Sequence, residues 1–270
     1  MKARDLIAAA VLIAALAAPA PAAEELTLQA LYKSIAERNY YPAVEGLKTA
    51  KADVTCSVFD TVVAAFPEVD KSAIKVSFSW SRPTQEVAPV KTFAVVGIPE
   101  EQADLSRRAQ LIFQGRGQED MVIEQPIYWT IETIDASAVA DGGTITVSGA
   151  AKSASSALKG LTVTINQSDY KIKRMVMDLG GAEATIDMTS TALGSKWGVE
   201  SSVLTTPQYK RVMQYEYTQV DGIYLPSKIS VDYQGLDGSA LEPTYVYQFS
   251  NWSVERHPEE AASTPQSGGS

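Results

Sequence analysis

The side chains that most often carry catalysis are scarce in this sequence and poorly spaced for it. His257 is the single histidine among 270 residues, and Cys56 is the single cysteine. A Ser/His/Asp triad, a Cys/His pair and a multi-histidine metal site each need histidine close to the other members of the site. His257 stands beside a segment that has the composition of a tail. The sequence therefore predicts that the protein is not an enzyme and holds no metal or cofactor.

Adjacent carboxylates are the remaining candidates for acid and base chemistry. They stand at Glu100-Glu101 and at Glu259-Glu260. The first pair follows Pro99 and fits the first turn of a helix, where acidic side chains are favoured. The second pair lies in the expected tail. Both pairs indicate structure rather than catalysis, and the sequence has no glycine-rich nucleotide motif or calcium loop.

Cys56 lies in alternation with Ala52 and Val54. This pattern predicts a buried, small apolar residue, with a reactive thiol as the other interpretation. A single cysteine also excludes an internal disulfide.

The sequence is better supplied with large, adaptable apolar side chains at alternating positions. Methionine and aromatic side chains suit a wall that adapts to flexible acyl chains. An ordinary packed core is the other explanation, and it fits any one of these residues. The candidates for an apolar ligand cavity are Phe78, Trp80, Trp129, Met175, Met177, Met188, Met213, Tyr215 and Tyr217.

Two regions are expected to be helical and to help position these side chains. Residues 26–48 contain apolar residues at three- and four-residue spacing before Pro42 interrupts the pattern. A second short helical turn is expected to carry Val44 and Leu47. Another helix is expected to start at Pro99.

About ten strands are expected, because apolar and polar residues alternate over short segments. The clearest pair is a hairpin that turns at Asp221-Gly222. The segments are 52–58, 74–80, 93–96, 127–131, 145–147, 161–165, 182–188, 213–217, 229–233 and 245–249.

Together these elements predict an α+β fold, with one large curved antiparallel sheet, or half-barrel, covered by a few helices. A sandwich of two sheets is the alternative arrangement. A strongly curved sheet leaves a trough that few helices can fill completely, and an incompletely filled trough is a ligand cavity.

Three regions are expected along the chain. Residues 1–23 have the pattern of a secretory signal peptide, because Lys2 and Arg4 precede an apolar run and small residues. Residues 24–257 are expected to form a single domain. Residues 258–270 contain no aromatic or branched apolar residue, and this predicts a disordered tail.

The signal peptide predicts export from the cytoplasm. No later segment has the ~20 consecutive apolar residues of a membrane-spanning helix. The formal net charge of −9 argues against binding to nucleic acid, which selects basic surfaces.

Four segments in one order carry a resemblance to a known family. They are Phe78-Ser79-Trp80-Ser81-Arg82-Pro83, Leu161-Thr162-Val163-Thr164-Ile165, Tyr170-Lys171-Ile172-Lys173-Arg174-Met175, and Tyr217 to Ile229 with its Asp-Gly-x-x-Leu-Pro hairpin. Across most of the mature chain this order and spacing resembles the periplasmic outer-membrane lipoprotein carrier (LolA-like) family. The resemblance implies a half-closed barrel lidded by helices, with an apolar cavity for the acyl chains of lipoproteins or a related lipid.

The same resemblance implies a role for Arg82. In better-known members of the family, the arginine of a strand-end Arg-Pro pair helps to hold the helical lid closed over the empty cavity. Arg82-Pro83 stands at the matching place. The planar guanidinium can donate several hydrogen bonds to helix-end carbonyls, although a surface arginine before a strand-breaking proline is the other interpretation. The sequence departs from the family pattern at Gln85 and Glu86, where an apolar residue is expected.

The expected function is that of a soluble periplasmic carrier. It would bind lipid or lipoprotein acyl chains in an apolar cavity and pass them towards the outer membrane, with membrane-bound donor and acceptor proteins as partners. A non-enzymatic envelope adaptor, which uses the same fold with a filled core to bind a protein partner, is the alternative. An exported carboxylate-dependent hydrolase is the weakest hypothesis, because histidine chemistry is missing.

Overall fold

The computed structural model describes residues 27–82, 89–120 and 126–257. The expected signal peptide (1–23), the expected tail (258–270), the Glu259-Glu260 pair, Pro83, Gln85 and Glu86 lie outside these ranges.

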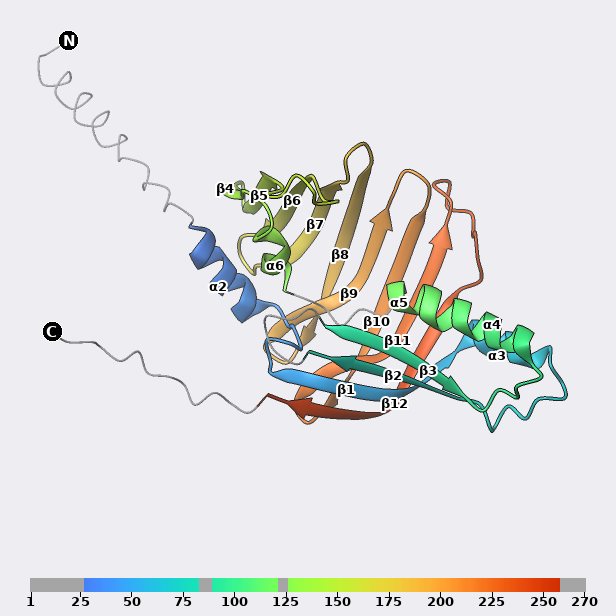
Figure 1. Cartoon of the computed structure of the whole chain (residues 1–270). Helices are drawn as coiled ribbons and strands as arrows, with labels where there is room; N and C mark the ends of the chain where they lie inside the picture. Colours follow the sequence, from blue (N-terminus) through green and yellow to red (C-terminus); the bar gives the residue numbers. More distant parts are fainter. Residues whose placement is uncertain (1–26, 83–88, 121–125, 258–270) are drawn as a thin grey trace, which may run out of the picture.

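The described chain is built on one antiparallel sheet of twelve strands (Figure 1). Their order across the sheet is β3-β2-β1-β12-β11-β10-β9-β8-β7-β6-β5-β4. The strands are β1 Leu47–Cys56, β2 Lys75–Ser81, β3 Val90–Val96, β4 Ser137–Asp141, β5 Thr144–Ala150, β6 Gly160–Asn166, β7 Ile172–Asp178, β8 Glu183–Leu193, β9 Lys196–Thr205, β10 Lys210–Val220, β11 Ile223–Gln234 and β12 Tyr245–Arg256. The expected α+β fold with one large curved sheet is confirmed, and the two-sheet sandwich is wrong.

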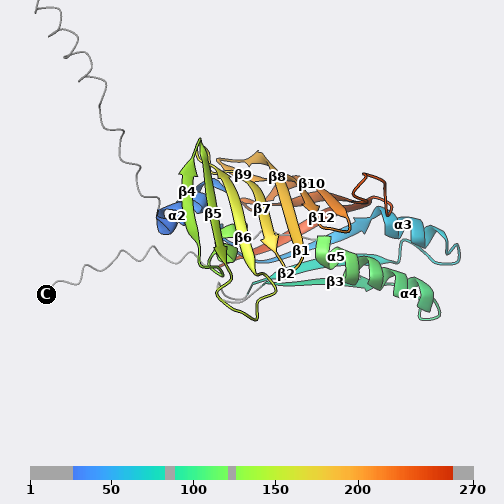
Figure 2. The same ribbon diagram turned by 90° about the horizontal axis from the view of Figure 1, so that it is seen from above.

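The helices lie at two separate places on the curved sheet (Figures 1 and 2). They are α2 Leu28–Arg38, α3 Ser57–Ala64, α4 Ala103–Gln110, the π-helical segment η1 Leu111–Arg116, α5 Gly117–Asp120 and α6 Ile127–Ile131. In Figure 1, α2 and α6 stand near β4 to β7, whereas α3, α4 and α5 stand at the other end of the molecule. In the described ranges, every helix is too short or too polar to cross a membrane.

The buried side chains form two clusters instead of one. The first, which includes Phe78 and Phe113, packs α3, α4 and η1 against β1, β2, β3 and β10 to β12. The second, which includes Ile131 and Val163, packs α2 and α6 against β5 and β6. Among the described residues, β8 contributes to neither cluster. The middle of the sheet is therefore its least filled part.

The N-terminal helix is confirmed, but it is shorter than its expected region. Thr27 caps α2, because its Oγ1 accepts a hydrogen bond from the Ala30 amide at 3.3 Å. The expected second helical turn at Val44 and Leu47 is wrong. Residues 42–46 form a turn, and Leu47 is already the first residue of β1.

The expected strand at residues 127–131 is also wrong, since these residues form α6. Pro126 precedes the helix with φ −57°, a value that suits a helix start. Ile127 and Ile131 are buried, and their four-residue separation places them on one helical face. The same spacing also satisfies strand alternation, so five residues could not distinguish the two structures.

Further differences involve segments with weak or ambiguous patterns. Val58, expected to continue a strand, lies in α3, whose Phe59 and Val63 are buried one helical turn apart. The helix expected from Pro99 begins at Ala103, after a turn that holds Glu100 and Glu101. The strands β4, β7 and β9 were not among the expected segments. Pairing with neighbours on both sides compensates for the weak strand propensity of β9, which contains glycine and serine.

The predicted hairpin at Asp221-Gly222 is confirmed as the turn between β10 and β11. Asp221 and Gly222 both have positive φ, 49° and 79°, as the tight turns of two-residue hairpins require. Pro226 lies opposite Tyr217, beside a register shift in the pairing. A bulge accounts for a proline in the interior of the sheet, because the ladder of hydrogen bonds is interrupted there.

Candidate functional site

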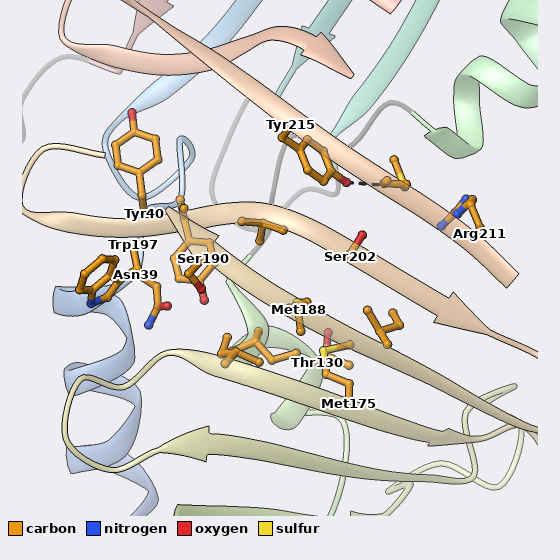
Figure 3. Close-up of a pocket in the computed structure, with 17 residues that line it drawn as sticks. Asn39, Tyr40, Thr130, Met175, Met188, Ser190, Trp197, Ser202, Arg211 and Tyr215 are labelled. Atoms are coloured by element: carbon orange, nitrogen blue, oxygen red, sulfur yellow. Dashed lines mark hydrogen bonds between the residues drawn. The ribbon is translucent and has the colours of Figure 1, made fainter. Parts of the chain in front are cut away.

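A cavity of about 240 Å³ lies over the middle of the sheet, where the two buried clusters leave a gap (Figure 3). Its wall is formed by β7 to β10, and it is bordered by α6 and by the three residues that follow α2. It is lined by Asn39, Tyr40, Tyr41, Ile127, Thr130, Ile172, Met175, Ile186, Met188, Ser190, Trp197, Gly198, Val199, Ser202, Arg211, Met213 and Tyr215.

The cavity exists because small residues stand between large ones on the inner face of the sheet. Met188 of β8 and Met213 of β10 both lie opposite Ser202 of β9. Residues paired in this way project from the same face of a sheet. The serine side chain is too short to fill the space between the two methionines, so this row across the sheet leaves room for a ligand.

A larger hollow of about 490 Å³ lies near α2 and β4, but its character differs. Glu132, Asp135 and Lys152 are among the residues that line it. Charged side chains of this kind remain hydrated. The smaller, apolar cavity is therefore the better ligand site.

Aromatic contacts and one cation hold α6 beside the cavity. The Tyr128 ring packs against Tyr32 at a centroid distance of 5.9 Å and edge-on against Tyr41 at 6.4 Å. On the next residue of α6, the Trp129 ring lies 3.9 Å from the guanidinium carbon of Arg82. Arg82 is buried, and burial lowers its pKa from the usual value. These contacts fasten α6 to α2 on one side and to the end of β2 on the other.

The Arg82–Trp129 contact predicts that Arg82→Leu loosens α6 and speeds the exchange of a cavity ligand. A cation over a desolvated indole contributes about 0.5–2 kcal/mol, so the exchange rate of a fluorescent acyl probe should rise roughly 2- to 30-fold. Stopped-flow release measures this rate. The control is Arg174→Leu, which removes an exposed arginine paired with Asp187 at 3.4 Å. Equal release rates in the two variants would remove Arg82 from the proposed closure.

The residues after α2 close one end of the cavity. Asn39 is buried, and its Nδ2 donates to the carbonyls of Ile35 at 3.1 Å and Tyr170 at 3.0 Å. The Tyr40 hydroxyl accepts a hydrogen bond from the Tyr224 amide at 2.7 Å. These bonds connect the end of α2 to the β6–β7 turn and to β11, so hydrogen bonds fix this end of the cavity to the sheet.

Because of Tyr40, the free energy of unfolding is expected to decrease at alkaline pH. Burial raises the pKa of Tyr40 from 10.0 to about 12. The folded pKa exceeds the unfolded one, so this stabilisation is fully present below pH 10 and is lost as the pH rises towards 12. The loss amounts to about 2–3 kcal/mol. Urea unfolding between about pH 9 and about pH 12 should show a smaller decrease in the unfolding free energy for Tyr40→Phe than for the natural chain. An equal decrease would contradict the assignment.

A buried polar network adjoins the other end of the cavity. The Asp120 carboxylate is fully buried and accepts hydrogen bonds from the hydroxyls of Tyr233 at 2.7 Å and Tyr247 at 3.3 Å. Arg211 lines the cavity, and its Nη1 lies 3.6 Å from Asp120 Oδ1. Burial raises the pKa of Asp120, while the two hydroxyls and Arg211 favour its ionised form. This network ties α5 to β10, β11 and β12.

The predicted site residues are only partly brought together. Met175, Met188, Met213 and Tyr215 line the cavity, and the Tyr215 hydroxyl donates to Met213 Sδ at 3.6 Å (Figure 3). The other candidates do not line it. Phe78 and Trp80 are buried in the first cluster, Trp129 stacks with Arg82, Met177 packs against the second cluster, and the Tyr217 hydroxyl donates to the Val199 carbonyl at 2.7 Å.

Several lining residues had no sequence signal that identified them. Asn39, Thr130, Ser202 and Arg211 are polar, so a search for large apolar side chains passes over them. Ser202 can be identified as a cavity residue only when the pairing of β9 with β8 and β10 is known, because that pairing places it between two methionines.

The residues first considered for catalysis lie elsewhere. Cys56 is buried, as predicted, and burial raises the pKa of its thiol, so the reactive thiolate is disfavoured. His257 follows β12, where its amide donates to the Gly46 carbonyl at 2.8 Å. Across the described ranges, no three His, Cys, Asp or Glu side chains gather into a metal site.

Comparisons with known proteins give structural likenesses alone. No family model matches the sequence, and no curated protein matches it either. The structure is similar to that of a LolA superfamily protein from Nitrosomonas europaea, with 7% identity, 86% of this chain and 96% of that chain covered, and a TM-score of 0.30. It is also similar to a putative outer membrane lipoprotein-sorting protein domain from Vibrio parahaemolyticus, with 9% identity, 85% and 93% covered, and a TM-score of 0.33.

Proposed function

We propose that the protein is a non-enzymatic periplasmic carrier that binds an acyl chain of a lipid or lipoprotein in the cavity over β7 to β10. The observation that carries the proposal is the methionine-rich cavity between the two buried clusters, bordered by α6. Cargo would pass towards the outer membrane by way of membrane-bound donor and acceptor proteins.

The size and surface of the cavity suit an acyl chain. Each methylene that leaves water for an apolar site contributes about 0.8 kcal/mol, and methionine side chains adapt to a flexible chain. The volume of about 240 Å³ lies just below the range of about 300–1,000 Å³ that is usual for small-molecule sites. It therefore suits part of one chain, and a cargo with several chains would require α6 to move.

The envelope adaptor is the less favoured function. An adaptor of this fold needs no internal space, and its core would be filled beneath the helices. A cavity lined by Met175, Met188 and Met213 costs packing energy in the empty protein. A ligand that fills the space would offset this cost. None of the described residues that line the cavity is a histidine or an acid, which supports a carrier over a hydrolase.

The proposal is tested by isolating the protein from the periplasm of the cells that make it and extracting it for mass spectrometry. A carrier should yield lipid or lipopeptide in near-stoichiometric amount. An unrelated periplasmic protein of similar size, isolated in parallel, gives the background. Consistently empty protein would count against a carrier and favour the adaptor.

A further inference from the structure

Arg211 places a positive charge at one end of a cavity whose other described lining residues are uncharged. It lies on β10 two residues before Met213, so both side chains project from the same face of the sheet. Figure 3 shows Arg211 at one end of the cavity and Asn39, Tyr40 and Trp197 at the other. The charge of the described lining therefore lies at one end of the cavity.

The guanidinium of Arg211 is largely buried, but not all of its N–H groups have a hydrogen-bond acceptor among the described residues. Its side chain is 17% exposed, and its Nε atom is buried without a hydrogen-bond partner among the described residues. Its Nη1 lies 3.6 Å from Asp120 Oδ1 and donates to the Glu119 carbonyl at 3.4 Å, which is a long contact. A buried N–H that lacks an acceptor costs free energy. The contacts of Nη1 are longer than ordinary N–H···O bonds, so a carboxylate in the cavity would bind the guanidinium more closely than they do.

Asp120 neutralises this cation only in part. Its carboxylate oxygens are already engaged by the hydroxyls of Tyr233 and Tyr247. Lys91 also stands nearby: after burial itself, the positive charge of Arg211 is the next cause that lowers the pKa of Lys91. Arg116 also acts on Asp120, and it pairs with Glu119 at 3.9 Å and with Glu242. Among the described charges of this network, Arg211 is the one that lines the cavity.

We propose that the cavity takes a single-chain amphiphile with an acidic head group, and that Arg211 binds the head while the chain lies along Met213 and Met188. This inference rests on the proposed carrier function and names its ligand class. A guanidinium binds a planar carboxylate through two parallel N–H donors. The head group expected is therefore a carboxylate, as in a long-chain fatty acid.

The test compares two ligands that share one chain and differ in charge. Dissociation constants of hexadecanoic acid and hexadecanol are measured at mildly alkaline pH by displacement of a neutral fluorescent apolar probe. The acid should bind at least about tenfold more tightly than the alcohol, because a hydrogen bond to a charged group contributes that much. Acetate alone, which has the head without the chain, should not displace the probe at the same concentrations.

Arg211→Gln should remove the preference for the acid, so that the ratio of the two dissociation constants falls to about one. The matched control is Arg174→Gln, which removes an exposed arginine on β7 and should retain the preference. Equal binding of acid and alcohol to the natural chain would overturn this inference and leave the carrier proposal standing. Binding of neither ligand would overturn the carrier proposal itself. Both outcomes are measured on the natural chain, so the test does not depend on whether a variant folds.

Discussion

Replacing Ser202 with tryptophan is expected to reduce the affinity for an acyl chain by at least about tenfold. Ser202 lies opposite both Met188 and Met213, at the centre of the cavity wall. An indole at this position would occupy the space that the serine leaves. Exclusion of only two methylenes, at about 0.8 kcal/mol each, already accounts for the tenfold loss.

Ser201→Trp is the matched control, because Ser201 is the preceding residue and projects from the opposite face of β9. Its hydroxyl contacts that of Thr189 at 2.8 Å, outside the cavity. Titration with a fluorescent acyl probe measures both variants, and circular dichroism checks that both are folded. Undiminished binding in folded Ser202→Trp would show that the chain binds somewhere else.

Asp120→Ala is expected to destabilise the protein by about 3–5 kcal/mol. The change leaves the hydroxyls of Tyr233 and Tyr247 without their shared buried acceptor, and the guanidinium of Arg211 without its ion-pair partner. Removal of one partner from a buried, hydrogen-bonded charge pair typically has this cost. For a domain of this size, each 1 kcal/mol lowers Tm by about 2–4 °C.

Urea unfolding at neutral pH measures the change. Asp120→Asn, which retains an acceptor for the Tyr233 hydroxyl, should lose less stability than Asp120→Ala. Asp104→Ala removes an exposed acid whose contact with Arg108 is 3.6 Å, and it should change the unfolding free energy by less than about 0.5 kcal/mol. If Asp120→Ala were no more harmful than Asp104→Ala, the network would not stabilise the junction of α5 with the sheet.

The long alternating segments made the sheet predictable from the sequence. The hairpin of β10 and β11 is the clearest case, since alternation and the Asp221-Gly222 turn specify both strands and their register. Tertiary pairing determined the strands that the sequence did not predict. In β9, Gly198 and Ser202 carry little strand propensity, yet β8 and β10 pair with it on both sides.

The structure of α6 could not be predicted for a different reason. Its two buried isoleucines satisfy the helical and the strand period equally over five residues, so only the surrounding contacts decide. The role of Trp129 changed with it. As a strand residue it was expected to line the cavity, whereas on α6 it stacks with Arg82.

The presence of a cavity on the sheet was predictable from the sequence, but its details were not. Large adaptable side chains identified Met175, Met188, Met213 and Tyr215, all of which line it. The space itself depends on where small residues fall between them, and that follows from the register. Arg211 escaped prediction because a charge at an apolar wall is visible only after β10 is aligned with its neighbours.

Photochemical labelling can show whether an acyl chain lies in the cavity over the middle of the sheet. The full chain is irradiated with a hexadecanoyl probe that carries a diazirine near its methyl end, and the modified peptides are identified by mass spectrometry. A chain bound in the cavity should label β7 to β10 and α6, with residues such as Met175 and Met188 among the sites, and Ser202→Trp should suppress this labelling. Labelling confined to exposed apolar residues of other elements, such as Leu111 or Val96, would contradict binding in the cavity.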